Sequence, residues 1–373
     1  MGSTGFTKAD MVLVLACVVI LLALLMPAVT ESRGPARRNQ CSTQVKNLAL
    51  GAIQHEVARG VMPGYLMNFG HHSPSTAMQS VRDSAQVRSD QHRKIGTWAV
   101  ALLPWLDAQP TYEHWTDEKY PVVIFDGGLV YHEFAAPNLA IMQCPSDPSS
   151  DSETVAKNSY IANVGMSYRN AKGDSPYTIL TEDGMEKAVN FANSMRIANG
   201  VFHNQVETRL PNGTPAWAGP AVRLDDFKDG QGNTLLFSEN LQAGPWHQIG
   251  FAEAEGLLKV DDKPWVFPAE APFRQGMVWH WEDDQHESSP SVNALHRING
   301  GNPFHDVMTP SNAQSLARPS SAHVEGVNAG MADGGTRFIT ETIDYRVYQA
   351  LLTPNGTKSD VPYPEYVLAP DAL

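Results

Sequence analysis

The first 29 residues constrain the fold more than any other part of this chain. A short polar start ends in Gly5-Phe6, and Asp10 precedes an uninterrupted apolar run from Met11 to Met26. A secretory signal has a basic start and a small-residue cleavage site after its apolar stretch. Because the expected cut lies before the apolar run here, we predict that the mature chain keeps this segment. It would then serve as a membrane anchor or a subunit-packing helix.

The length of the apolar run is close to that of a membrane span. Its 16 residues would form a helix of roughly 24 Å, against about 30 Å for a bilayer core. Including Phe6 and the extension to Val29 brings the segment into spanning range. We therefore predict a leader over residues 1–5, a transmembrane or assembly helix over residues 6–29, and a globular domain over residues 30–373.

Asp10 has two interpretations. A carboxylate at the edge of an apolar helix is costly in lipid, which makes it a candidate for function. The same residue could simply favour the start of the helix through the helix dipole.

The basic residues give a weak signal for orientation. Lys8 precedes the apolar run, whereas several basic residues follow it: Arg33, Arg37, Arg38 and Lys46. By the positive-inside rule, this distribution mildly favours a cytoplasmic C-terminal side. The cysteines favour the opposite orientation, with the globular domain outside the cytoplasm.

Composition and cysteine usage limit the class of protein. The net charge is −13 over 373 residues. Because nucleic acid is itself negatively charged, we expect it not to be a partner of this protein. Cys17 lies inside the apolar run, so Cys41 and Cys144 are the cysteines outside it. In an exported domain such a pair often forms a disulfide, and the alternative is two buried free thiols.

Apolar spacing resumes after Pro27 and Gly34-Pro35 and predicts a second helical stretch, so residues 6–59 form one long helix with an interruption. One face of this stretch carries an apolar stripe that must pack on the globular domain: Cys41, Val45, Leu48, Ala49, Ala52 and Ile53. The helix is predicted to end near Gly60.

Short apolar runs separated by turn residues predict strands in the rest of the chain. The expected strands cover residues 121–125, 159–164, 234–239 and 277–279, and a hairpin joins residues 327–332 to 336–339 around Asp333-Gly334. A short helix broken at Pro104 is expected over residues 98–106, and a final helix over residues 343–352. Residues 68–94 are predicted to be a loop, and roughly residues 245–320 a large loop-rich insertion.

The densest group of potential metal ligands lies between His280 and Glu287. Two histidines six residues apart do not share a helix face, and the carboxylates do not match an EF-hand loop, so a solvated loop is the favoured interpretation over a metal site. No paired-cysteine motif and no clustered Cys/His spacing indicates zinc, so we expect no metal and no cofactor. Ser321, His323 and Asp333 could be combined into a hydrolase triad, but no nucleophile-elbow motif supports it. We therefore expect no enzyme activity.

Several separated motifs together resemble a bacterial family of pilin-like proteins that carries the domain of unknown function numbered fifteen-fifty-nine, also labelled as a solute-binding family. The resemblance covers nearly the whole chain. It rests on the Gly5-Phe6-Thr7 start, Met26 to Val29, Arg37 to Ser42, Lys46 to Leu48, Leu103 to Leu106 with Gln109-Pro110, Cys144 to Pro148, Leu224 with Asp229-Gly230, Asn233 to Leu236 and Glu239, Ser321 to His323, Ala332 to Gly334, and Arg337 to Ile339.

The resemblance implies an α+β fold with a long N-terminal helix packed on an antiparallel β-sheet. It also implies cleavage between Gly5 and Phe6 by a prepilin peptidase, and methylation of Phe6. Asp10 is then the fifth mature residue, where pilins usually carry Glu, and it would pair with the Phe6 amine of a neighbouring subunit during assembly.

Two functions are therefore expected from the sequence. The first is a non-enzymatic, pilin-like or pseudopilin-like subunit of the cell surface or of a secretion apparatus, held in the inner membrane and able to join a filament of like or unlike subunits. The second is an anchored extracytoplasmic protein that binds a solute or glycan. Four tryptophans in or near the insertion motivate the second function, although they could equally belong to the core: Trp246, Trp265, Trp279 and Trp281.

Overall fold

The computed structural model describes residues 7–73, 91–125, 129–148, 156–181, 183–209, 215–251 and 269–365. The side chains of residues 22–33 and of residues 124, 125, 129, 208, 215 and 216 are outside this description. Gly5 and Phe6, the predicted processing residues, lie outside it as well.

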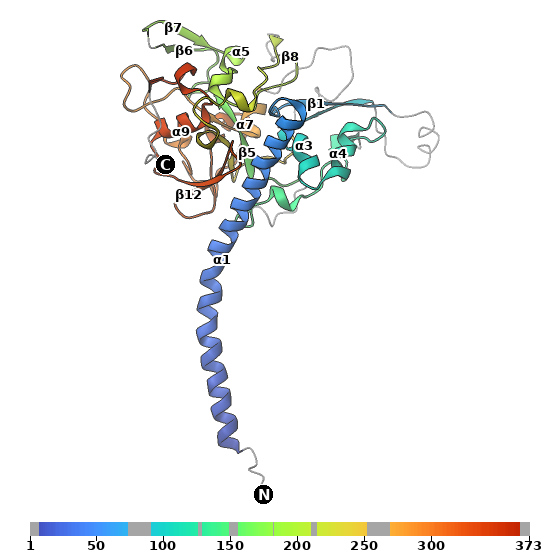
Figure 1. Cartoon of the computed structure of the whole chain (residues 1–373), viewed down its shortest axis with the longest axis vertical. Coiled ribbons are helices and arrows are strands. Elements are labelled where there is room, and N and C mark those ends of the chain that lie inside the picture. The colour runs from blue at the N-terminus through green and yellow to red at the C-terminus, as the bar shows by residue number, and fades with distance from the viewer. Residues whose placement is uncertain are drawn as a thin grey trace.

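One helix, α1 (Lys8–Arg59), extends from the globular head as a stalk (Figure 1). Thr7 caps its start, because the Thr7 Oγ1 accepts from the Asp10 amide at 3.3 Å and the Asp10 carboxylate accepts in return from the Thr7 amide at 2.9 Å. Gly60 ends it in the left-handed conformation, with φ 77°, which glycine adopts without strain. The predicted interruption after Pro27 and Gly34-Pro35 is wrong, because α1 continues through these residues. A proline removes one helical hydrogen bond, and a helix can accommodate this loss by bending.

The C-terminal half of α1 packs on the head through the predicted stripe. Cys41, Val45, Leu48, Ala49 and Ala52 are buried, and Ile53 is half-buried. The helix lies against the strands β10 (Leu235–Glu239) and β12 (Gly326–Met331). Close approach is possible because β12 carries Gly330, where an added Cβ would lie 2.9 Å from Val45 Cγ1.

A five-stranded mixed sheet forms the centre of the head. Its order is β11 (Gly276–Trp279), β5 (Tyr160–Met166), β10, β12 and β13 (Thr336–Thr340). All neighbouring pairs are antiparallel except β11 and β5, which are parallel. The α+β class is therefore confirmed, whereas the expectation of a purely antiparallel sheet is wrong.

The sheet separates two apolar layers. On one side, α1 and the helix α3 (Trp98–Leu102) contribute to a core with Ala162 and Leu236. On the other side, α9 (Tyr345–Leu352) packs on β10 and β11 and contributes to a second core with Ile161 and Trp279. The predicted insertion, roughly residues 245–320, therefore supplies β11 to the central sheet of the head.

Smaller elements surround these layers. The paired strands are β1 (Met67–His72) with β2 (His92–Gly96), β3 (Val123–Phe125) with β4 (Leu129–Tyr131), β6 (Tyr177–Leu180) with β7 (Glu186–Val189), and β8 (Thr208–Arg209) with β9 (Pro215–Ala216). The other α-helices among the described residues are α4 (Gln109–Thr116), α5 (Phe191–Ser194), α7 (Ala271–Arg274) and α8 (Ala313–Leu316). Short 3-10 turns cover Leu103–Trp105, Ala140–Met142, Ile197–Asn199, Leu224–Asp226, Gln231–Asn233, Ala294–His296 and Gly356–Lys358. The prediction of a loop over residues 68–94 is wrong at both ends, because β1 and β2 pair there.

The first half of the stalk differs from the rest of the molecule in its surface. Apolar side chains of α1 from Met11 to Leu21 are exposed on successive positions around the helix. Within the described part of the chain, no helix has both the length and the apolar character needed to cross a membrane. The predicted span of residues 6–29 falls partly on residues 22–29, whose side chains lie outside the description.

Candidate functional site

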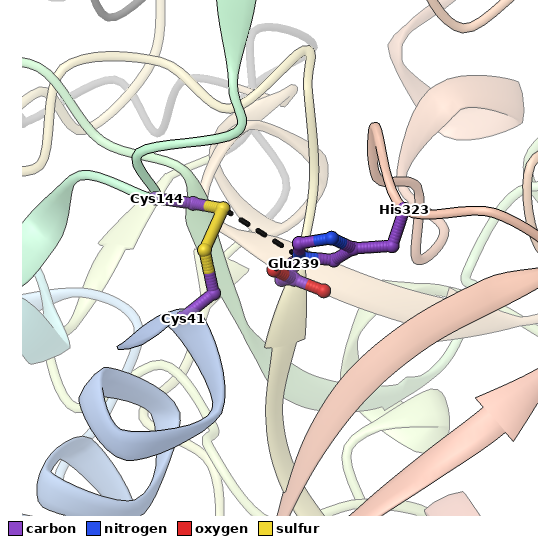
Figure 2. Close-up of side chains that lie close together, drawn as sticks. All are labelled: Cys41, Cys144, Glu239 and His323. Atoms are coloured by element: carbon purple, nitrogen blue, oxygen red, sulfur yellow. Dashed lines mark hydrogen bonds and ion pairs between the residues drawn. A yellow bond between two sulfur atoms is a disulfide. The ribbon is translucent and has the colours of Figure 1, made fainter. Parts of the chain in front are cut away.

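Four buried side chains from distant parts of the chain meet where the stalk enters the head (Figure 2). Cys41 lies on α1, Cys144 follows the 3-10 turn Ala140–Met142, Glu239 is the last residue of β10, and His323 lies in the loop before β12. One ligand-type atom from each residue lies within 4.8 Å of the others. We call these four residues the junction cluster.

The two cysteines of the junction cluster form a disulfide across 103 residues of sequence. Cys41 is fully buried and Cys144 is 3% exposed. The predicted disulfide is confirmed, and the alternative of two free thiols is wrong. The bridge fixes α1 to the segment that precedes β5, so the stalk is covalently tied to the head.

Glu239 and His323 form a buried pair beside the disulfide. The His323 Nε2 lies 2.9 Å from Glu239 Oε1, and both side chains are at most 5% exposed. The second oxygen of Glu239 accepts from the Asn328 amide at 2.7 Å and from the Asn328 side-chain amide at 3.1 Å. Burying a carboxylate without partners costs free energy, so these hydrogen bonds explain how Glu239 can be buried at the end of β10.

His323 also faces the sulfur of the bridge. Its Nε2 lies 3.7 Å from Cys144 Sγ, and its backbone amide donates to Ser321 Oγ at 3.0 Å. The Cys144 backbone amide donates to Ser159 Oγ at 3.1 Å, and Ser159 Oγ donates to Asp147 at 2.7 Å. The cluster therefore combines an imidazole, a carboxylate and two cysteine sulfurs. Histidine, carboxylate and cysteine side chains are common metal ligands, and the cysteine sulfurs are also redox-active.

The residues of the rejected hydrolase triad are arranged for other roles. The carboxylate partner of His323 is Glu239, whereas Asp333 accepts from the Gly335 amide at 2.7 Å in the turn between β12 and β13. Ser321 Oγ donates to the Gly326 carbonyl at 2.7 Å. The serine thus shapes the loop that carries His323.

A hollow of about 450 Å³ adjoins the cluster, and His323 is part of its lining. Its lining comes from α1, the His323 loop and the strands β12 and β13: Gly34, Pro35, Arg38, Asn39, Ser42, His323, Val324, Asn328, Thr336, Arg337 and Phe338. The Arg38 guanidinium lies 3.4 Å from the centre of the Phe338 ring, a cation–π contact. Ser42 Oγ donates to Thr336 Oγ1 at 3.2 Å. The hollow therefore combines apolar surface with polar and cationic side chains.

Asp10 lies far along the stalk from the junction cluster, at the first turn of α1 (Figure 1). Its carboxylate is engaged by Thr7, as the helix-start interpretation expects. The neighbouring-amine role predicted for Asp10 involves Phe6, which is outside the described residues.

The ligand-rich segment from His280 to Glu287 is divided between core and surface. His280, Glu282 and Asp283 are buried, whereas Asp284 and Glu287 are exposed. The solvated-loop interpretation is therefore wrong for its first half.

Contacts within the head account for these buried groups. Glu282 Oε2 lies 3.0 Å from His296 Nδ1, and the His296 ring stacks on His280 with 3.6 Å between centroids. Burial lowers the pKa of His280 to about 3 and of His296 to about 4. Asp283 pairs with Arg346 at 2.6 Å, so this segment ties α9 to the sheet.

Most of the tryptophans that motivated solute binding belong to the core. Trp246 and Trp279 are fully buried, and Trp281 is 7% exposed. Trp265 lies outside the described residues. The core interpretation is confirmed for the first three, so they do not line a ligand surface.

The sequence did not predict the pairing of Glu239 with His323. The two residues are separated by 84 positions, and neither has a local spacing typical of a site. The only signal was that each belongs to one of the motifs that carry the family resemblance.

Comparison with known proteins gives one match. The family model described as "Protein of unknown function (DUF1559)", with the label SBP_bac_10, matches residues 31–346. No curated protein and no solved structure matches the chain. The match covers the C-terminal half of the stalk and the head as far as Arg346, including the whole junction cluster.

Proposed function

We propose that this chain, which belongs to the family described as "Protein of unknown function (DUF1559)", is a membrane-anchored, pilin-like subunit without enzyme activity. Its N-terminal helix would be held in the inner membrane and its head would stand outside the cytoplasm. Processing would expose Phe6 as the first mature residue, and Asp10 would contact the amine of a neighbouring subunit. This arrangement would allow the subunit to assemble into a filament of like or unlike subunits.

The observation that carries the proposal is the exposed apolar surface of the stalk. Nine large apolar side chains between Met11 and Leu21 are 47% to 69% exposed: Met11, Val12, Leu13, Val14, Leu15, Val18, Val19, Ile20 and Leu21. A contiguous apolar surface of this kind marks a membrane or protein contact. Because these side chains surround the helix, a cover is needed on every side, which lipid or a bundle of neighbouring stalks supplies.

The buried disulfide supports the proposed orientation of the head. Disulfides form and persist in oxidising compartments, and they are rare in the cytosol. This argument opposes the weak orientation signal of the basic residues. We give it more weight because the bridge is part of the packed head.

Mass spectrometry of the N-terminus after expression in a host with a prepilin peptidase tests the proposal. We expect a mature chain that begins at methylated Phe6 and is recovered in the membrane fraction. A chain that keeps Met1 but remains in the membrane would leave an anchored protein and remove the pilin route. Recovery of the intact chain in the soluble fraction would overturn both.

A second candidate function is the binding of a small polar solute at the hollow beside His323. Its support is the set of hydrogen-bonding and cationic groups there, with Arg38 over the ring of Phe338 and Arg337 in the same lining. Planar guanidinium groups suit carboxylates and phosphates, and an aromatic ring suits a sugar face. The solute-binding label of the family agrees with this candidate.

Thermal-shift screening of the full chain against glycans, dicarboxylates and phosphate esters would test solute binding. A hit should weaken in Arg337→Ala, whereas Arg223→Ala, which lies outside the hollow, should retain it. Equal shifts in both variants would place binding elsewhere.

A further inference from the structure

We propose that the junction cluster is a redox-gated metal site. When the Cys41–Cys144 bridge is reduced, the two thiolates, the His323 imidazole and the Glu239 carboxylate would bind one divalent transition metal of the zinc type. The metal would then replace the disulfide as the link between stalk and head. This inference is independent of membrane anchoring and of filament assembly.

The donor set matches what zinc prefers. Thiolate sulfur, imidazole nitrogen and carboxylate oxygen are the usual protein ligands of Zn²⁺, and four of them in tetrahedral array form a closed structural site. The junction cluster offers two sulfurs, one nitrogen and one carboxylate oxygen, all within 4.8 Å of one another and all buried. Its ligands come from four separate segments, so a metal there would hold the whole junction together.

The separations between ligand atoms are near those of a tetrahedral site. Bond lengths of about 2.0–2.3 Å place the ligand atoms about 3.3–3.8 Å apart. His323 Nε2 lies 3.7 Å from Cys144 Sγ, within this range. It lies 2.9 Å from Glu239 Oε1, which a shift of a few tenths of an ångström would correct. The sulfurs must move apart, and breaking the bond between them permits this.

Asn328 already holds the carboxylate in a suitable orientation. It donates its backbone and side-chain N–H groups to Oε2 of Glu239. Oε1 is therefore left facing His323 Nε2, and both atoms could direct lone pairs at a metal between them. Hydrogen bonds of this kind orient metal ligands and strengthen binding.

Reduction gates the site because disulfide sulfurs cannot act as thiolate ligands. A dithiol reductant supplies two electrons and two protons, becomes a disulfide itself, and leaves Cys41 and Cys144 as thiols. Binding of Zn²⁺ then displaces the two thiol protons. Once the metal has left, a disulfide-containing oxidant accepts two electrons and two protons from the free thiols, becomes a dithiol itself and restores the covalent bridge. The junction is therefore crosslinked in both redox states.

Zinc titration of the full chain in detergent, in a Cys17→Ser background, tests this inference. The substitution removes the remaining cysteine, which is exposed on the stalk. After reduction and removal of the dithiol, we expect one tightly bound zinc per chain. The oxidised chain should bind none at the same concentration. Co²⁺ in place of zinc should give the visible and sulfur charge-transfer bands of a tetrahedral thiolate site.

Ligand variants separate the site from adventitious binding. His323→Ala should weaken zinc binding by more than about 100-fold, since even the outer partners of a metal site contribute about 10–100-fold. His286→Ala, outside the cluster, should leave zinc binding unchanged. Glu239→Gln keeps the size of the side chain and provides a second test if the alanine variant does not fold.

Protection of the thiols gives an independent measurement. In the reduced chain, zinc should slow alkylation of Cys41 and Cys144 in the parent but not in His323→Ala. The inference is overturned if the reduced parent binds no zinc at one-to-one stoichiometry, if oxidised and reduced chains bind alike, or if His323→Ala and Glu239→Gln both bind like the parent.

Discussion

The two halves of α1 have the same backbone conformation and opposite environments. Leu13 in the first half is 65% exposed, whereas Leu48 in the second half is fully buried against the sheet. In the second half, apolar residues that lie off the packing stripe are exposed too, such as Leu50 at 38% and Val57 at 75%. The second half thus buries one face, whereas the first half has apolar side chains exposed around the helix.

This difference shows that the stalk and the head are stabilised by different surroundings. The packed half of α1 is part of the head's core, so its side chains contribute directly to the free energy of unfolding. The described side chains of the first half, up to Leu21, are exposed and contribute nothing to that core. Its apolar side chains acquire a stabilising role only through a cover such as lipid or neighbouring helices.

Removing the disulfide should have the largest effect on the packed half. In a Cys17→Ser background, the double change Cys41→Ser with Cys144→Ser should lower the unfolding free energy of the head by about 2–5 kcal/mol, because the bridge closes a long loop. Urea unfolding in detergent would measure it. Cys17→Ser alone should have little effect. A double variant as stable as this control would mean that packing alone holds the stalk to the head.

Truncating one leucine in each half tests the comparison directly. Leu48→Ala should lower the unfolding free energy by about 2–5 kcal/mol, because it leaves a cavity between α1 and the sheet. Leu13→Ala should change it by less than about 0.5 kcal/mol. Leu50→Ala serves as the matched control within the packed half. Equal losses at Leu13 and Leu48 would contradict the division of α1 into two regions.

A charge in the first half should affect the membrane and leave the head intact. Leu15→Arg places a cation on the exposed apolar surface, which costs about 2.5–3.5 kcal/mol near the centre of a membrane-inserted helix. We expect less of the chain in the membrane fraction after alkaline extraction, with an unchanged urea midpoint for the head. Leu15→Phe is the control of similar apolar character. Undiminished retention of the arginine variant would argue against insertion of this segment.

Buried histidines should make the head less stable in acid, and the effect of each histidine should be smaller than the effects of the changes above. Burial lowers the pKa of His203 to about 4, below about 6.5 for an unfolded histidine. Between these values the unfolded chain binds a proton that the folded head does not. Stability is therefore lost as the pH falls, by up to about 1.4 kcal/mol per pH unit for one histidine.

His203→Leu removes this contribution. We expect the difference in unfolding free energy between pH 7.5 and pH 5 to be smaller in the variant than in the parent. Chemical unfolding at both pH values would measure it, with any packing change from the substitution cancelling in the difference. An unchanged pH dependence would show that the pKa of His203 is the same in the folded head as in the unfolded chain.

Several elements could be predicted because local pattern and tertiary contact agree. The stripe from Cys41 to Ala52 has helical spacing, and it is buried as expected. The hairpin around Asp333-Gly334 forms β12 and β13, and Gly334 has a positive φ of 80° that the turn requires. Strand β10 and helix α9 also lie where their apolar runs predicted.

Other features could not be predicted because they depend on contacts between distant segments. Nothing in the local sequence of β11 indicates that it pairs in parallel with β5. The segment from His280 to Asp283 has the polar composition of a loop, yet it is buried because His296 and Arg346 supply partners from elsewhere.

The sequence by itself determined the long N-terminal helix, its apolar start and its buried stripe, because helical periodicity is a property of neighbouring residues. The α+β class was implied by the family resemblance of its motifs. Only the tertiary structure decided that Cys41, Cys144, Glu239 and His323 meet at one point. The physical reason is that their proximity results from the packing of α1 on the sheet and from the end of β10. No spacing along the chain encodes that arrangement.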